Sequence, residues 1–120
     1  MSLYWWLHGK LTRRRRARNW AEGIRVMLDD AGVRWEVKPR TEFAESRAVR
    51  WEELSGIAEF PDNGAAPDGL LVLRREAAES DFLPLEAEGA RALLDEARRR
   101  GLLRPLAELT AEREANERAR

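Results

Sequence analysis

The sequence predicts a small α/β (or α+β) domain, and three patterns in its 120 residues carry this prediction. An apolar segment, a helix-like stripe and an alternating segment follow one another between residues 3 and 37. Strand-like segments occupy the middle of the chain, and two helix-like segments close it. At this length we expect residues 1–110 to form a single domain and residues 111–120 a charged, frayed helical tail.

The N-terminal patterns predict a βαβ unit. Residues 3–7 are apolar on both faces, which is typical of a strand covered on two sides and ended by Gly9. From about Arg14 an apolar stripe predicts a helix that Gly32 stops, and its members are Trp20, Ile24, Met27, Leu28 and Ala31. Apolar and charged residues then alternate over 33–37, which predicts a half-buried strand before Pro39. This order favours parallel strands at the start of a small mixed sheet.

The secondary structure of the middle of the chain is harder to predict. The spacing of Val49, Trp51 and Leu54 fits either a short helix or a strand. Turn signals at 61–64 and 67–69 flank two alanines and predict a hairpin or crossover loop. The apolar run 70–73 predicts a buried strand. Residues 82–85 predict another, and Pro84 indicates that it lies at the edge of a sheet.

The last forty residues predict two helices. The first begins near Glu86, ends before Gly101 and carries one apolar face, made of Ala90, Leu93, Leu94 and Ala97. Pro105 opens the second helix, whose only large apolar residues are Leu106 and Leu109. Beyond Ala111 the residues are mostly charged and have nothing to bury, which predicts fraying.

Composition excludes several classes of function. The 22 basic and 22 acidic residues cancel, so any attraction to nucleic acid must come from local charge segregation. Cysteine is absent and histidine occurs once, so we expect no disulfide, metal or cofactor. No apolar run approaches the ~20 residues of a membrane span, and the N-terminus lacks the order of a signal peptide. We expect a soluble cytoplasmic protein with no membrane contact.

The clearest local signal is a run of arginines. Six basic residues lie within nine positions, namely Lys10, Arg13, Arg14, Arg15, Arg16 and Arg18. They precede the expected helix, where the helix dipole is already positive, so they are unfavourable there unless an anion is present. Guanidinium groups hold phosphates by paired hydrogen bonds, and indoles close by offer stacking surfaces. These residues are the candidate anion- and partner-binding site. The alternative is a solvated face whose arginines pair with acidic residues elsewhere.

Residues 4–9 and 21–36 resemble the thioredoxin-like N-terminal half of glutathione transferases. The likeness lies in Tyr4-Trp5-Trp6-Leu7-His8-Gly9 and in Ile24-Arg25, followed by Ala31-Gly32-Val33 and Trp35-Glu36. The resemblance implies a thioredoxin-like fold, with Tyr4 as the catalytic residue that activates the glutathione thiol. Pro67 and Glu79-Ser80 would correspond to the residues that hold the glutathione backbone. About ten residues, 10–19, stand where the family has almost none, and the helical second domain has no room.

Two further patterns suggest chemistry. Glu36 and Lys38 form the Glu-x-Lys pair of metal-dependent nucleases, in which the carboxylate holds Mg²⁺ and the lysine orients water. The Asp that should precede this pair on another strand is missing, because Asp29 and Asp30 end the expected helix and Asp68 comes later. His8 has no evident carboxylate partner for acid–base catalysis, so a place in a turn is the simpler interpretation of this residue.

Together these observations favour a small non-catalytic binding or assembly module, such as a complex subunit or an inhibitor-type protein. Its basic segment would contact an anionic partner, either nucleic acid or an acidic protein surface, and it could form an oligomer. The alternatives are a glutathione-transferase-like domain and, less favoured, a small metal-dependent nuclease.

Overall fold

Two three-stranded antiparallel sheets and two helices make up the part of the chain that the computed structural model describes, residues 21–37, 45–64 and 67–120. The first sheet contains β1 (Ile24–Leu28), β2 (Gly32–Val37) and β3 (Glu45–Arg50) in that order. One 3₁₀ turn, η1 (Trp51–Glu53), leads into the second sheet, formed by β4 (Leu54–Phe60), β5 (Gly69–Arg74) and β6 (Ser80–Pro84). Helices α2 (Ala90–Arg99) and α3 (Leu106–Arg118) follow. The mixed class and the two C-terminal helices are as predicted.

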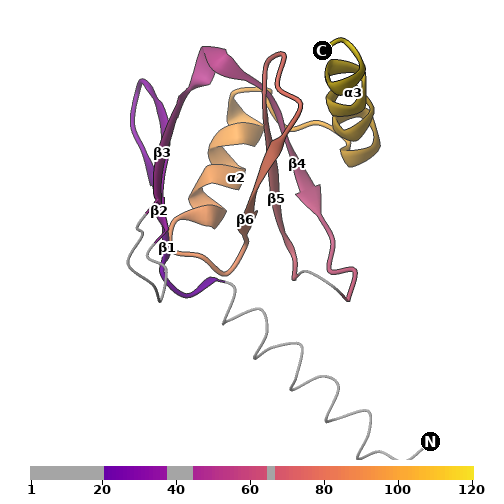
Figure 1. The fold of residues 1–120 in the computed structure, drawn as a ribbon. Coiled ribbons are helices and arrows are strands. Elements are labelled where there is room, and N and C mark those ends of the chain that lie inside the picture. The colour runs from indigo at the N-terminus through magenta and orange to yellow at the C-terminus, as the bar shows by residue number, and fades with distance from the viewer. Residues whose placement is uncertain (1–20, 38–44, 65–66) are drawn as a thin grey trace, which may run out of the picture.

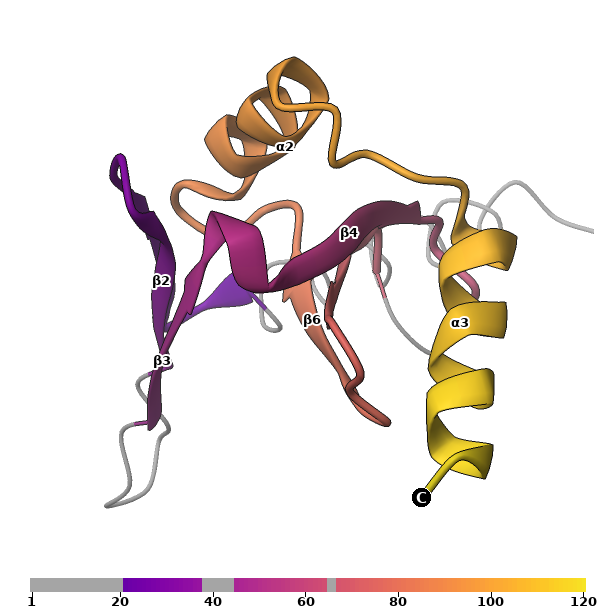
Figure 2. The ribbon, with the colours of Figure 1, turned by 90° about the horizontal axis from the view of Figure 1, so that it is seen from above.

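The main core lies between the two sheets and is completed by α2. In Figures 1 and 2 this helix lies between the first sheet and the second, whereas α3 lies on the outer side of the second sheet. Both sheets and α2 supply buried side chains to one cluster, which includes Val26, Val33, Trp35, Val49, Leu54, Ile57, Leu70, Val72, Leu83, Leu93 and Ala97. Within the described ranges no polar or charged side chain is fully buried.

Strand β5 separates two apolar layers. Leu70 and Val72 face the main core, whereas Leu71 and Leu73 point to the other side and meet α3 in a second, smaller cluster. A strand that is buried on both faces has to be apolar throughout, which explains the run at 70–73. The prediction of a buried strand there is confirmed, as is the edge strand over 82–85, because β6 is the last strand of its sheet.

The expected helix that ends at Gly32 is wrong over its described part. Residues 24–28 form strand β1, which pairs with β2 in antiparallel register, Leu28 opposite Val33. Ile24, Val26 and Leu28 alternate toward the core, and two of them, Ile24 and Leu28, fit the helical period as well. Asp29 accepts hydrogen bonds from the backbone N–H groups of Ala31 and Gly32, at 2.8 and 2.9 Å, and so closes a hairpin turn.

The parallel neighbour that a βαβ unit predicts for β2 is not found among the described strands. Strand β2 is the central strand of its sheet, and antiparallel neighbours, β1 and β3, occupy both of its edges. Both sides of β2 are therefore paired with antiparallel strands. Residues 3–7, expected to form the parallel strand, and the first part of the expected helix lie outside the described residues. The strand predicted over 33–37 is confirmed as β2.

The helices agree with the prediction more closely. Helix α2 begins four residues after Glu86, because Gly89 adopts a positive φ of 85° directly before it. Helix α3 follows Pro105 as expected. Helix α3 extends to Arg118, so most of the segment expected to be a charged, frayed helical tail, residues 111–120, is helical in the structure. No helix in the described ranges has the length and apolarity needed to cross a membrane.

Candidate functional site

The residues predicted to bind an anionic partner all lie outside the described residues. These are Lys10, Arg13, Arg14, Arg15, Arg16 and Arg18, and the candidate catalytic Tyr4 and His8 lie there too. Their charge can nevertheless be set against the rest of the chain. Residues 1–20 contain six basic and no acidic side chains, so residues 21–120 hold the other 16 basic and all 22 acidic ones. The chain is thus divided into a segment of charge +6 and a remainder of charge −6.

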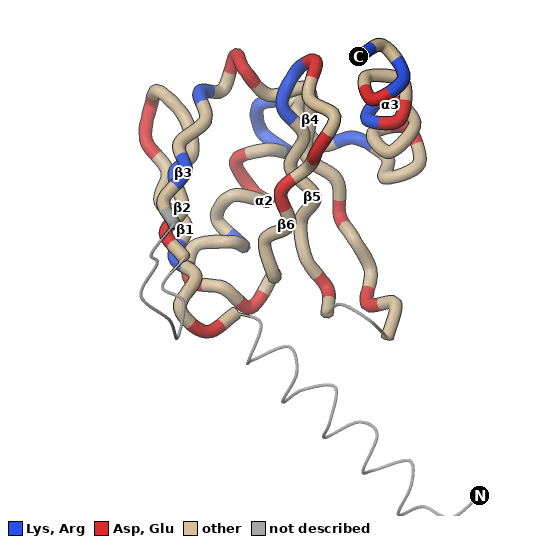
Figure 3. Tube along the Cα trace, in the orientation of Figure 1, with Lys and Arg blue, Asp and Glu red and all other residues tan. Residues whose placement is uncertain are grey.

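Much of the basic charge in the described body is matched internally. At the end of α2, Arg98 pairs with Asp95 at 3.7 Å, and Arg99 and Arg100 both pair with Glu96. Figure 3 shows acidic residues in the loops at the end of the molecule where residue 21 lies. The loop before α2 carries Glu86 and Glu88, which pair with Arg91 and Arg25 at 3.5 and 3.9 Å.

The residues that suggested a nuclease do not gather into a metal site. Glu36 lies half-buried on β2, whereas Asp29 and Asp68 each accept backbone hydrogen bonds in separate turns. Lys38 lies outside the described residues. Among the residues that are described, no group of three histidine, cysteine, aspartate or glutamate side chains is placed to hold a metal ion.

The residues that carried the glutathione-transferase resemblance have other surroundings. Ile24 and Arg25 lie in strand β1 rather than in a helix. Ser80, expected to hold a peptide backbone, begins β6, and its hydroxyl accepts a hydrogen bond from the guanidinium of Arg113 on α3 at 3.0 Å. Pro67 is buried in the connection between β4 and β5, which form an antiparallel pair, so the turn signals there belong to a hairpin.

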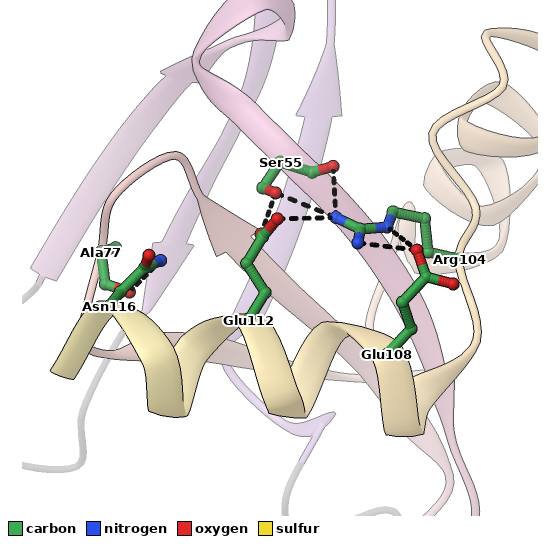
Figure 4. A network of polar contacts seen from close by, with 6 residues as sticks. All are labelled: Ser55, Ala77, Arg104, Glu108, Glu112 and Asn116. Atoms are coloured by element: carbon green, nitrogen blue, oxygen red, sulfur yellow. Dashed lines mark hydrogen bonds and ion pairs between the residues drawn. The ribbon is translucent and has the colours of Figure 1, made fainter. Parts of the chain in front are cut away.

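The most developed polar cluster in the described body joins α3 to the second sheet, and we call it the α3 latch. It consists of Ser55 on β4, Arg104 before α3, and Glu108 and Glu112 on α3 (Figure 4). The Arg104 guanidinium donates to Glu108 Oε1 at 2.8 Å, to Glu112 Oε1 at 3.2 Å and to Ser55 Oγ at 3.0 Å. Ser55 Oγ in turn donates to the other carboxylate oxygen of Glu112.

The latch is ionised and is fixed by charge. The hydrogen bond from Ser55 lowers the pKa of Glu112, and the Arg104 guanidinium lowers it further. The hydrogen bond to Glu108 raises the pKa of Arg104. A carboxylate with a lowered pKa is a weaker general base than a free carboxylate. The contacts of the cluster join α3 to the second sheet. Two more contacts extend it, from Arg113 to Ser80 and from Asn116 Nδ2 to the Ala77 carbonyl oxygen at 3.1 Å.

Trp51 forms a second junction, between the two sheets and α2. The residue is 7% exposed, and its indole N–H donates to the Asp29 carbonyl oxygen at 3.0 Å. The guanidinium of Arg100 lies over the ring, 4.4 Å from its centroid. Trp51, whose segment the sequence pattern assigned to neither helix nor strand, thus connects the hairpin turn at Asp29 to the end of α2.

Several hollows of the described surface are lined by both acidic and basic residues. One of about 510 Å³ is lined by both signs, with members Glu52, Glu53, Arg74, Arg75, Ala77 and Arg120. Because carboxylates stand beside the guanidinium groups, this hollow does not select an anion by charge. Comparison of the chain with protein-family models, curated proteins and solved structures finds no match.

Proposed function

We propose that this protein is a small non-catalytic binding or assembly module that contacts an anionic partner through its basic segment, residues 10–18. The observation that carries the proposal is the division of charge, +6 over residues 1–20 and −6 over the remainder. The remainder of the chain is negatively charged, like the proposed partner, so it does not attract nucleic acid or an acidic protein. The contact therefore depends on the arginine run, and the α+β body serves as its carrier.

Binding that rests on this segment has a defined salt dependence. Neutralising phosphates releases counterions, and each contact adds about 0.9 to the slope of log affinity against log salt for duplex DNA. Three of the arginines changed to alanine, Arg14, Arg15 and Arg16, should lower that slope by about 2 to 3. The measurement is retention on heparin and binding to a DNA duplex over a series of salt concentrations.

A matched control separates the segment from the overall charge. Arg91, Arg98 and Arg99 are exposed on α2, and their replacement by alanine changes the net charge by the same amount. This variant should keep the salt slope of the unchanged protein. Equal losses in the two variants would contradict the proposal. Binding to a polyglutamate surface but not to DNA would assign an acidic protein as the partner. Retention on immobilised glutathione that Tyr4→Phe abolishes would support the transferase alternative instead.

A further inference from the structure

Helix α3 stands apart from the main core. The main cluster draws its buried residues from both sheets, η1, α2 and the loop before α2, and none of them comes from α3. Leu109 is the one buried residue of α3, and it belongs to the smaller cluster with Ala58, Leu71 and Leu73. The main core is therefore complete without α3, and elements held in this way open locally at a lower free energy than the whole domain.

The chain before α3 is fixed independently of the helix. Residues 102–104 run along the edge of β4, where the Ile57 N–H donates to the Leu102 carbonyl oxygen and the Arg104 N–H donates to the Ile57 carbonyl oxygen, both at 2.9 Å. Leu103 and Ile57 form a parallel bridge. Pro105 follows this anchored stretch directly, so a movement of α3 away from the sheet would begin there and would leave the backbone of Arg104 paired with β4.

The surface beneath α3 has the form of a helix-binding site. Its floor is apolar, made of Ala58, Leu71 and Leu73. Hydrogen-bonding groups surround this floor: the Ser55 and Ser80 hydroxyls, the Ala77 carbonyl oxygen and the Arg104 guanidinium. The α3 residues that meet them, Leu109, Glu112, Arg113 and Asn116, have the i, i+3, i+4, i+7 spacing of one helix face.

We propose that this outer face of β4 and β5 is a second interaction surface, which α3 covers until a helix of a partner protein displaces it. The partner helix carries a large apolar residue for the floor and a carboxylate three positions later, because the undocked helix leaves the Arg104 charge without that acceptor. Helix α3 is a weak occupant, with only Leu106 and Leu109 as large apolar residues against the sheet. A partner helix with a wider apolar face binds this surface more tightly than α3 does. The α3 helix of a second copy makes only the same contacts, and it has to compete with the protein's own α3, which is covalently linked to the surface.

The test uses a fluorescent peptide with the sequence of residues 105–120 and the full-length protein. In the Leu109→Ala variant the tethered helix loses its one buried anchor while the sheet face is unchanged. The variant should bind the peptide at least about tenfold more tightly than the unchanged protein, because the open fraction rises by that factor. Leu106→Ala is a second variant of the same kind. Hydrogen exchange of the β5 amides checks that the body of each variant is folded.

Two controls fix the mode of binding. A peptide with the Leu109→Ala and Glu112→Gln changes should bind at least about tenfold more weakly than the unchanged peptide. The Arg14/Arg15/Arg16→Ala protein should bind the unchanged peptide as before, which excludes capture by the basic segment and makes the result independent of the proposed function. Equal affinity of all the folded variants would overturn the proposal. A dimer of the unchanged protein that forms through exchanged α3 helices would overturn the choice of occupant.

Discussion

Gly89 offers a sharp test of how α2 is joined to the first sheet. This glycine has a φ of 85°, and a Cβ added to it would overlap the carbonyl oxygen of Val26 on β1 and lie 3.0 Å from the carbonyl carbon. Directly beside it, the Val26 N–H donates to the Glu88 carbonyl oxygen at 2.7 Å. Gly89→Ala therefore forces the loop before α2 away from β1 and breaks this hydrogen bond.

The cost has two parts of different origin. A non-glycine residue in the left-handed region loses about 1 to 2 kcal/mol. The displaced loop forfeits about 1 kcal/mol of hydrogen bonding and leaves a buried N–H that costs a further ~1 to 2 kcal/mol. Gly89→Ala should thus lower the free energy of unfolding by about 3 to 5 kcal/mol, a large share of the ~5 to 15 kcal/mol of a typical domain.

Gly101 supplies the matched control. Its φ is 71°, but a Cβ there would meet nothing within 4 Å, so Gly101→Ala carries only the backbone cost. Both variants also gain equally from a stiffer unfolded chain, and that gain cancels between them. Urea unfolding of the two variants measures the difference, which we expect to be about 2 to 3 kcal/mol. Equal destabilisation would show that the close approach of Gly89 to Val26 contributes nothing, and would refute the reasoning.

Three further results are expected. Trp51→Phe should lower the free energy of unfolding by about 1 to 3 kcal/mol, through the lost hydrogen bond to Asp29 and the smaller ring, as urea unfolding will show. Arg100→Gln removes the cation above that ring together with the ion pair to Glu96, and should cost about 0.5 to 2 kcal/mol in the same assay. The α3 latch should weaken in acid: because folding lowers the pKa of Glu112, its contribution is complete above the ordinary glutamate pKa of about 4.3 and is lost as the pH falls through the lowered value. The difference in free energy of unfolding between the unchanged protein and Glu112→Gln should therefore become smaller as the pH falls through the lowered pKa of Glu112. A difference that stays constant with pH would contradict this.

Local sequence patterns predict an element correctly where the pattern fits only one kind of secondary structure. The alternation of Val33, Trp35 and Val37 and the stripe of α2 each fit one period, and the continuous apolar run of β5 fits a strand buried on both faces. A turn residue bounds each of them. Ile24 and Leu28 fit both the helical period and a period of two, so only pairing with β2 decides that β1 is a strand. Such pairing is non-local, and the sequence pattern does not contain it.

The middle segment and the latch show the same limit. Val49, Trp51 and Leu54 have irregular spacing because the chain passes from one sheet to the other at η1, so no single period applies. Within the latch, the i, i+4 spacing of Arg104, Glu108 and Glu112 is visible in the sequence as a chain of charge pairs. Ser55 is 57 residues from Glu112, and no sequence signal connects the two.

The attachment of α3 also decides how the protein responds to tension. A load applied at Arg120 reaches α3 first and peels it from the sheet, one polar contact after another. The load then reaches the short edge pairing of residues 102–104 with β4, which two backbone hydrogen bonds hold. The tightly packed layers behind it remain shielded until these outer fastenings have given way. A load applied through a tether fused after Arg120 would therefore detach α3 before it unfolded the rest of the domain.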